Sequence, residues 1–118
     1  MKIVKMSEVP KQTRVDPAFA GTVSSQPVVT DSKEVRVSIV NFGKGARNKF
    51  HMHDADQILI ISAGKGIVAT EKEERVVTVG EVVLFPAGEK HWHGATKDSE
   101  FSHIVVTKAG SKTTQQEK

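Results

Sequence analysis

Short runs of alternating apolar and polar residues, closed by glycine, proline or charged turns, fill the middle of the chain. In residues 35–42, for example, Val35, Val37 and Ile39 would share one face of an extended strand. No window shows the periodicity of an amphipathic helix. Many short strands with glycine and proline between them predict an all-β fold, either a sandwich or a barrel.

The same pattern divides the chain into three parts. Further strands are expected at residues 57–62, 66–70, 75–79, 81–85 and 101–107. We predict an N-terminal arm with a possible edge strand at 1–25, a barrel at 26–108 and a flexible tail at 109–118, which is poor in apolar residues. With 118 residues, the chain is long enough for one core.

Composition excludes several classes of function. The chain has no cysteine, which excludes disulfides, thiolate ligands and cysteine nucleophiles and is typical of a cytoplasmic protein. No apolar run approaches membrane-spanning length and no signal peptide is recognisable, so we expect no membrane partner. The net charge is +3, but lysines are scattered among acidic residues and aromatics make up 5%. This argues against a nucleic-acid partner.

All five histidines lie between Phe50 and Ile104, and four of them form two His-x-His pairs. Residues two apart point to the same side of a strand, so each pair directs two imidazoles the same way. The apolar runs around the pairs place that side in a barrel interior. Because imidazole is the commonest side-chain ligand of transition metals, the pattern predicts a metal site.

Two spaced motifs carry a family resemblance. The first runs Gly45, five residues, His51-Met52-His53, three residues, Gln57, six residues, Gly64, and the second runs Gly80, five residues, Pro86-Ala87-Gly88, two residues, His91. Over roughly residues 40–106 the chain resembles the cupin superfamily. The resemblance implies a jelly-roll-like β-barrel of two antiparallel sheets with one divalent metal inside. Its implied ligands are His51, His53, Gln57 and His91.

The chain departs from the usual cupin pattern at Gln57, where the first motif commonly has a glutamate, and at Ala95, where the second commonly ends in asparagine. A divalent ion held by three neutral imidazoles and an amide keeps its full formal charge. It should be a strong Lewis acid and poorly suited to high-valent oxidising chemistry. The glutamine therefore favours redox-neutral chemistry.

The stretch PAGEKHWHGAT, followed by SHIVV, narrows the resemblance. It is similar to small cupins associated with carboxymuconolactone decarboxylases, a group that includes manganese-dependent hydroxynitrile lyases of bacteria. That similarity implies manganese as the metal and His93 and His103 as catalytic residues. The ligand set also accommodates iron, nickel, copper or zinc. By parity, the substrate pocket should be lined by Ser38, Val40, Leu59, Ile61 and Thr107.

Several alternatives stay open. A cupin without metal would keep its histidines as interior hydrogen-bonded groups, at a cost of about 1–3 kcal/mol for each one left unsatisfied, and metal binding is favoured for that reason. His93 and His103 could each be catalytic or structural. We expect a homodimeric, redox-neutral lyase acting on a small hydroxy or carbonyl compound. The alternatives are an iron-dependent dioxygenase and a non-catalytic metabolite-binding cupin.

Overall fold

The computed structural model describes residues 1–116, and nearly all of its regular structure is β. One short 3₁₀ helix, η1 (Met6–Glu8), precedes the strands. The strands are β1 (Gln12–Arg14), β2 (Phe19–Ala20), β3 (Val23–Val29), β4 (Val35–Phe42), β5 (Arg47–Asn48), β6 (His51–His53), β7 (Gln57–Thr70), β8 (Glu74–Thr78), β9 (Val82–Phe85), β10 (His91–Ala95), β11 (Phe101–Lys108) and β12 (Thr113–Gln115). Within residues 1–116, no helix could span a membrane.

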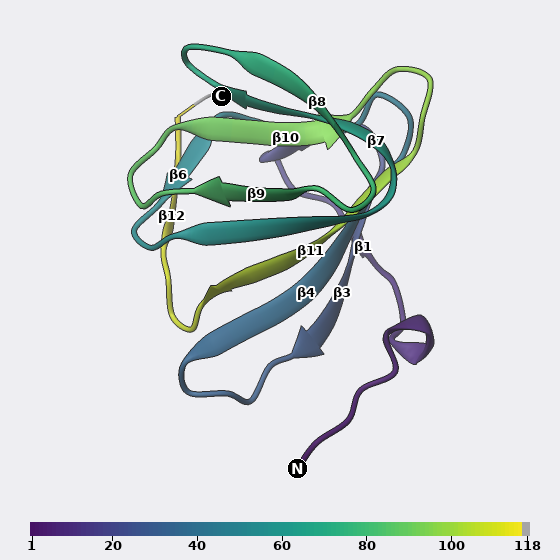
Figure 1. Cartoon of the computed structure of the whole chain (residues 1–118), viewed down its shortest axis with the longest axis vertical. Coiled ribbons are helices and arrows are strands. Elements are labelled where there is room, and N and C mark those ends of the chain that lie inside the picture. The colour runs from purple at the N-terminus through teal and green to yellow at the C-terminus, as the bar shows by residue number, and fades with distance from the viewer. Residues whose placement is uncertain (117–118) are drawn as a thin grey trace.

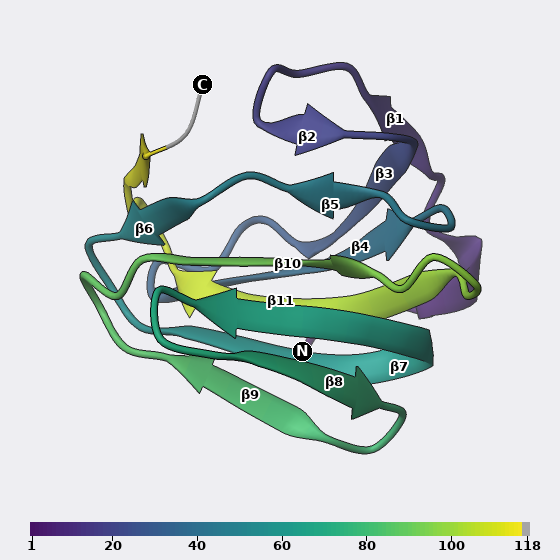
Figure 2. The same cartoon turned by 90° about the horizontal axis from the view of Figure 1, so that it is seen from above.

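Two antiparallel sheets form the barrel, and the long strand β7 belongs to both (Figure 1). The first half of β7 pairs with β11 and β9, and its second half pairs with β10 and β8. The first sheet continues from β11 through β4 and β3 to β1, and the second runs from β10 to β5 and β2 (Figure 2). This arrangement confirms the predicted barrel of two antiparallel sheets.

Strand β7 is continuous where the sequence predicted a break. Gly64 has a φ of +70°, a conformation that residues with a Cβ rarely adopt. The pairing with β11 shifts register between Ser102 and His103, close to this glycine. We attribute a bend in β7 to this glycine and the register shift beside it. The bend lets β7 pass from the first sheet to the second instead of ending in a turn.

The core lies between the inner faces of the two sheets. Along β7, Gln57, Leu59 and Ile61 are buried, whereas Ile58 and Ile60 face outward. The alternation follows from the two-residue period of a strand. The buried core consists mainly of Val23, Phe42, Leu59, Ile61, Val77, Phe85, Phe101 and Val105.

Both terminal segments pair with the barrel. β1 lies along the edge of β3, as the predicted arm would, and β2 pairs with β5. In the predicted flexible tail, residues 113–115 form β12 against β6, a pairing that the sequence did not predict. Residues 117 and 118 of that tail lie outside the described residues. The boundaries between arm, barrel and tail stay a prediction.

Gly94 lies opposite Arg47, where β10 and β5 approach closely. A Cβ added at Gly94 would lie 2.5 Å from both the Ala46 carbonyl oxygen and the Arg47 Cβ. We expect Gly94→Ala to lower the free energy of unfolding by about 1–3 kcal/mol, because backbone must move to relieve the overlap. Gly43→Ala is the control, since its Cβ would be 3.4 Å from its nearest neighbour. Equal stability of the two variants in urea denaturation would contradict this packing.

Candidate metal centre

Strand pairing brings the two His-x-His pairs together inside the barrel. β10 pairs with β6 so that His91 lies opposite His51, and the centroids of their rings are 4.4 Å apart. The His53 ring lies 4.9 Å from that of His51 and 5.3 Å from that of His91. Three imidazole rings from two separate motifs therefore lie next to one another inside the barrel.

The outer nitrogens of these rings are held by oxygen atoms. The Nδ1 of His51 donates to the Lys49 carbonyl at 2.6 Å, and that of His91 donates to the Glu89 carbonyl at 2.8 Å. The Nδ1 of His53 is 2.9 Å from the Thr113 hydroxyl, on β12. A proton on Nδ1 leaves Nε2 with a lone pair, which is the state that a metal ligand requires.

The polar atoms on the inner side of this cluster fit a cation. The Nε2 of His53 is buried and has no hydrogen-bond partner among the described residues. The Oε1 of Gln57 is 3.0 Å from the Nε2 of His91. Because His91 donates from Nδ1, two lone pairs face each other there. A cation coordinated by both atoms removes that repulsion.

A second set of imidazoles could also hold a metal. One ring nitrogen from each of His51, His91 and His93 lies within 4.8 Å of the others. The two sets share His51 and His91 and differ in their third member. The nitrogens of His93 are already engaged, since Nδ1 is 2.9 Å from the Nε2 of His103 and Nε2 is 3.1 Å from the Asn48 amide nitrogen. The unengaged Nε2 of His53 favours the first set.

Burial keeps these imidazoles neutral. It lowers the pKa of His51, and together with the nearby His51 charge it lowers the pKa of His53 to about 4. Burial also lowers the pKa of His91 to about 3, although the hydrogen bond to Glu89 opposes the shift. Lone pairs are therefore available for coordination throughout the neutral pH range.

His93 and His103 form a second buried pair beside the cluster. Both side chains are almost fully buried. Burial lowers the pKa of His93 well below its usual value, and the neighbouring His103 lowers it further. Burial lowers the pKa of His103 to about 3. The pair lies against Phe42, whose ring centroid is 5.9 Å from that of His93 and 5.5 Å from that of His103.

Asn48 orients His93, and sequence reasoning missed it. Its Oδ1 accepts the backbone N–H of His93 at 2.8 Å, which leaves its amide nitrogen to donate to the His93 ring. Asn48 is buried on β5, a strand of two residues. Such a short strand has no alternating pattern, so the sequence contained no signal that this asparagine points inward.

A cavity of about 340 Å³ opens beside the histidines. Among the predicted pocket residues, Ser38 and Val40 line it, whereas Leu59 and Ile61 are buried in the core and Thr107 is not in the lining. The sequence did not indicate that the terminal segments contribute to the wall. The full lining is Arg14, Asp16, Ala18, Phe19, Ser38, Val40, Asn48, His51, His53, Gln57, His93, Val105, Thr113 and Gln115.

Comparison with known proteins agrees with this geometry. The family model of the cupin domain matches residues 38–107, more than half of the chain. The chain belongs to the cupin family. It is 39% identical over 93 residues to an (R)-mandelonitrile lyase from Granulicella tundricola, covering 75% of this chain and 70% of that protein.

Two further relatives extend the comparison. This cupin is 32% identical over 81 residues to the pectin degradation protein KdgF of Dickeya dadantii, covering 68% of this chain and 72% of the relative. It is also 32% identical to a cupin-like protein from Thermotoga maritima of known structure. That match has a TM-score of 0.83 and covers 88% of this chain and 83% of the other. The predicted resemblance to cupins is confirmed.

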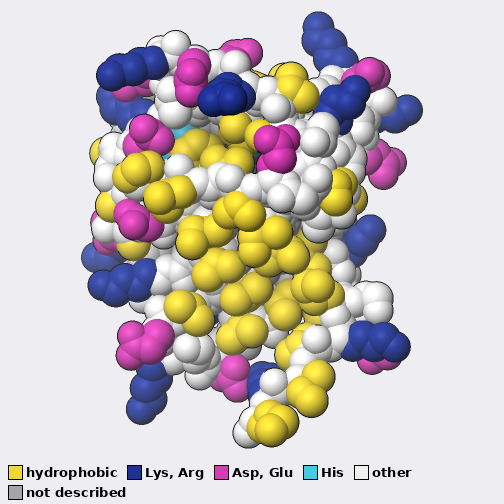
Figure 3. Space-filling model, in the orientation of Figure 1, with side chains coloured by type: hydrophobic (Ala, Val, Ile, Leu, Met, Phe, Trp, Pro, Cys, Tyr) yellow, Lys and Arg dark blue, Asp and Glu magenta, His cyan; other side chains and the backbone are white. Residues whose placement is uncertain are grey.

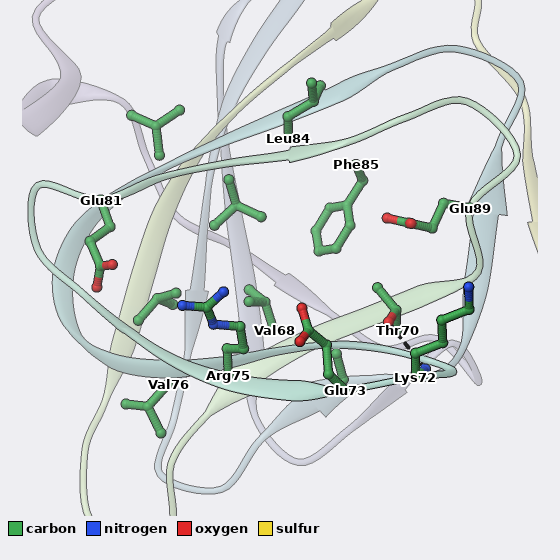
Figure 4. A pocket seen from close by; sticks show the side chains of 14 residues that line it. Val68, Thr70, Lys72, Glu73, Arg75, Val76, Glu81, Leu84, Phe85 and Glu89 are labelled. Carbon is green, nitrogen blue, oxygen red and sulfur yellow. Dashed lines mark hydrogen bonds between the residues drawn. The ribbon is translucent and has the colours of Figure 1, made fainter.

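A larger hollow of about 590 Å³ lies between β8 and β9, where the two sheets separate (Figure 4). Charged side chains stand around it, among them Glu73, Arg75 and Glu81, and Phe85 points into it. No histidine lines it. The ring of Phe85 stacks on that of His91 with centroids 3.8 Å apart, so it separates this hollow from the candidate metal centre.

Replacing Asn48 tests its role in this cupin. Asn48→Leu removes the acceptor of the His93 N–H inside the barrel. We expect a loss of about 1–3 kcal/mol in the free energy of unfolding, measured in urea, because a buried donor is left unsatisfied. Asn41→Leu is the matched control, since the half-buried Asn41 amide forms hydrogen bonds with Gln26 and Ser102 on the outer face. A loss for Asn48→Leu no greater than for the control would contradict the role.

The buried imidazoles predict a pH dependence of stability in metal-free protein. The pKa of His103 is about 3 in the native protein and 6.5 for an ordinary histidine. Between these pH values, the unfolded chain therefore binds a proton at His103 that the native protein does not. Stability should therefore fall with falling pH across this window, by about 1.4 kcal/mol per pH unit for each such histidine. His103→Leu should make the slope shallower by about that amount in urea denaturation between pH 6 and pH 4. An unchanged slope would contradict the assignment.

Proposed function

We propose that this cupin is a divalent-metal lyase with His51, His53, Gln57 and His91 as its metal ligands. The observation that carries the proposal is the set of outer-nitrogen hydrogen bonds of three imidazoles, together with the unpartnered Nε2 of His53 and the Gln57 oxygen 3.0 Å from the Nε2 of His91. All four donors are neutral. A bound divalent cation would supply positive charge that stabilises negative charge on a substrate oxygen. Manganese is the metal we propose, on the similarity to manganese-dependent hydroxynitrile lyases.

The substrate we propose is a small cyanohydrin, or a similar hydroxy compound that breaks a carbon–carbon bond to give a carbonyl compound. The similarity to the (R)-mandelonitrile lyase supports this choice. So does the cavity of about 340 Å³, which would hold a compact organic molecule.

His93 is the proposed catalytic residue, because it lines the cavity whereas His103 lies behind it. Its Nε2 would exchange the Asn48 amide for the substrate hydroxyl and take the hydroxyl proton as the carbon–carbon bond breaks and the bonding electrons leave with cyanide. The proton would then pass to cyanide, giving hydrogen cyanide and a carbonyl compound. His103 would act through His93 as a positioning residue, and the low dielectric around the pair would strengthen their hydrogen bond.

Two variants separate metal binding from proton transfer. His53→Ala should weaken Mn²⁺ binding by at least about 10–100-fold, measured by calorimetry on chelator-treated protein. His93→Ala should bind Mn²⁺ about as the wild type does but cleave (R)-mandelonitrile at least about 100-fold more slowly, followed by the absorbance of benzaldehyde. Exposed Lys97→Ala should change neither quantity. If His93→Ala lost the metal while His53→Ala kept it, the ligand set would be the alternative one.

Activity assays separate the rival functions. Wild-type protein loaded with Mn²⁺ should release benzaldehyde without consuming oxygen. Oxygen uptake by iron-loaded protein with a small aromatic substrate would instead favour the dioxygenase. Metal binding without turnover of (R)-mandelonitrile would overturn the lyase proposal and favour a metabolite-binding cupin.

A further inference from the structure

The C-terminal strand places a side chain against the candidate metal centre. Residues 112–116, which we call the strap, lie along β6, and β12 pairs with β6 so that Thr113 is opposite His53 (Figure 1). Thr113 and Gln115 line the cavity beside the histidines, whereas Thr114 between them does not. The two-residue period of a strand therefore directs alternate side chains of the strap toward the candidate metal centre.

The three proposed histidine ligands are oriented by two different means. The Nδ1 atoms of His51 and His91 each donate to the backbone carbonyl two residues earlier in the chain. These acceptors are part of the same local segment as the ligand. The Nδ1 of His53 is instead 2.9 Å from the Thr113 hydroxyl, which is 60 residues away in the chain. The orientation of His53 therefore depends on whether the strap is docked.

A hydroxyl orients an imidazole differently from a carbonyl. A carbonyl oxygen only accepts, whereas a threonine hydroxyl both accepts and donates. When Thr113 accepts the Nδ1 proton of His53, the buried and unpartnered Nε2 keeps a lone pair for a cation. A cation on Nε2 withdraws electrons from the ring, so the Nδ1–H becomes a better donor to Thr113. Coordination at His53 and docking of Thr113 should therefore strengthen each other.

Little else holds the strap on the barrel. Its three strand residues are exposed, and β12 pairs with β6 alone among the described strands. Hydrophobic side chains gather over β7, β11 and β4 (Figure 3), whereas the strap contains none. At its two ends, the Lys112 N–H donates to the Asp54 carboxylate at 2.8 Å and the Gln116 N–H donates to the Phe50 carbonyl at 2.9 Å.

Such a segment opens easily. A short edge strand with exposed hydrogen bonds and no apolar burial lies at the low end of local stability in a protein. The hydrogen bond between Thr113 and His53 is therefore a large part of what keeps the strap in place. Undocking would remove part of the cavity wall, because Thr113 and Gln115 form it.

We propose that Thr113 is a positioning residue for His53, and that docking of the strap and metal binding favour each other. The inference rests on the proposed function, in which His53 is a metal ligand. Thermodynamic linkage requires the two effects to be equal in size. If the docked strap raises metal affinity by a given factor, bound metal raises the docking equilibrium by the same factor.

Calorimetric titration of Mn²⁺ into chelator-treated protein compares three variants. Thr113→Val keeps the shape of the side chain but removes the hydroxyl, so it should weaken Mn²⁺ binding by at least about 10-fold. Thr113→Ser keeps a hydroxyl and should bind Mn²⁺ about as the wild type does. Thr114→Val is the matched control, because it makes the same change on the same strand outside the cavity lining. Circular dichroism verifies that each variant is folded.

The outcomes separate this inference from the proposed function. Equal Mn²⁺ affinities of folded Thr113→Val and Thr114→Val would overturn the inference and leave the proposed ligands in place. Equally weak binding by Thr113→Ser and Thr113→Val would also overturn it, because the hydroxyl would then not be responsible. A wild type that binds no Mn²⁺ would overturn the proposed ligand set and the inference with it.

Hydrogen–deuterium exchange of the wild type tests the coupling without any variant. Saturating Mn²⁺ should slow exchange of the Lys112 and Gln116 amides by about 10-fold, the linkage counterpart of the affinity lost in Thr113→Val. Exchange in β8, which pairs only with β7 among the described strands, is the internal reference and should change less. Strap exchange that Mn²⁺ leaves unchanged, or slows no more than that of β8, would overturn the proposal.

Discussion

The antiparallel register of β10 against β6 and β7 is the constraint on which the site depends. His91 lies opposite His51 across one pairing and opposite Thr70 across the other. A shift of one residue would turn His91 and His93 out of the barrel and Trp92 into it. Gly94 permits this register, because a side chain there would meet the backbone around Ala46. The imidazoles converge because this register turns the side chains of His91 and His93 toward the barrel interior, where His51 also points.

Burial determines the chemistry of the histidines once they have converged. It keeps them neutral, and oxygen acceptors outside the cluster decide which nitrogen of His51 and His91 carries the proton. The same low-dielectric surroundings make an unpaired lone pair costly. The unpartnered Nε2 of His53 and the Gln57 oxygen beside His91 are therefore the strongest structural support for a cation.

The first sheet is apolar on both sides for two different reasons. Its inner face supplies Leu59, Ile61, Phe101 and Val105 to the core, next to the cavity. Its outer face has no partner within the described chain, although its strands have the composition of a sheet buried on both sides.

Sequence alone determined the β class, the inward direction of both His-x-His pairs and the outward direction of Ile58 and Ile60. These follow from spacing within a strand, which has a period of two residues. Tertiary structure alone decided the pairing of β12 with β6 and the inward position of Asn48. It also decided that Ser38 lines the cavity whereas Leu59 lies in the core. Those depend on contacts between residues far apart in the chain, and no local period encodes which distant strand lies opposite.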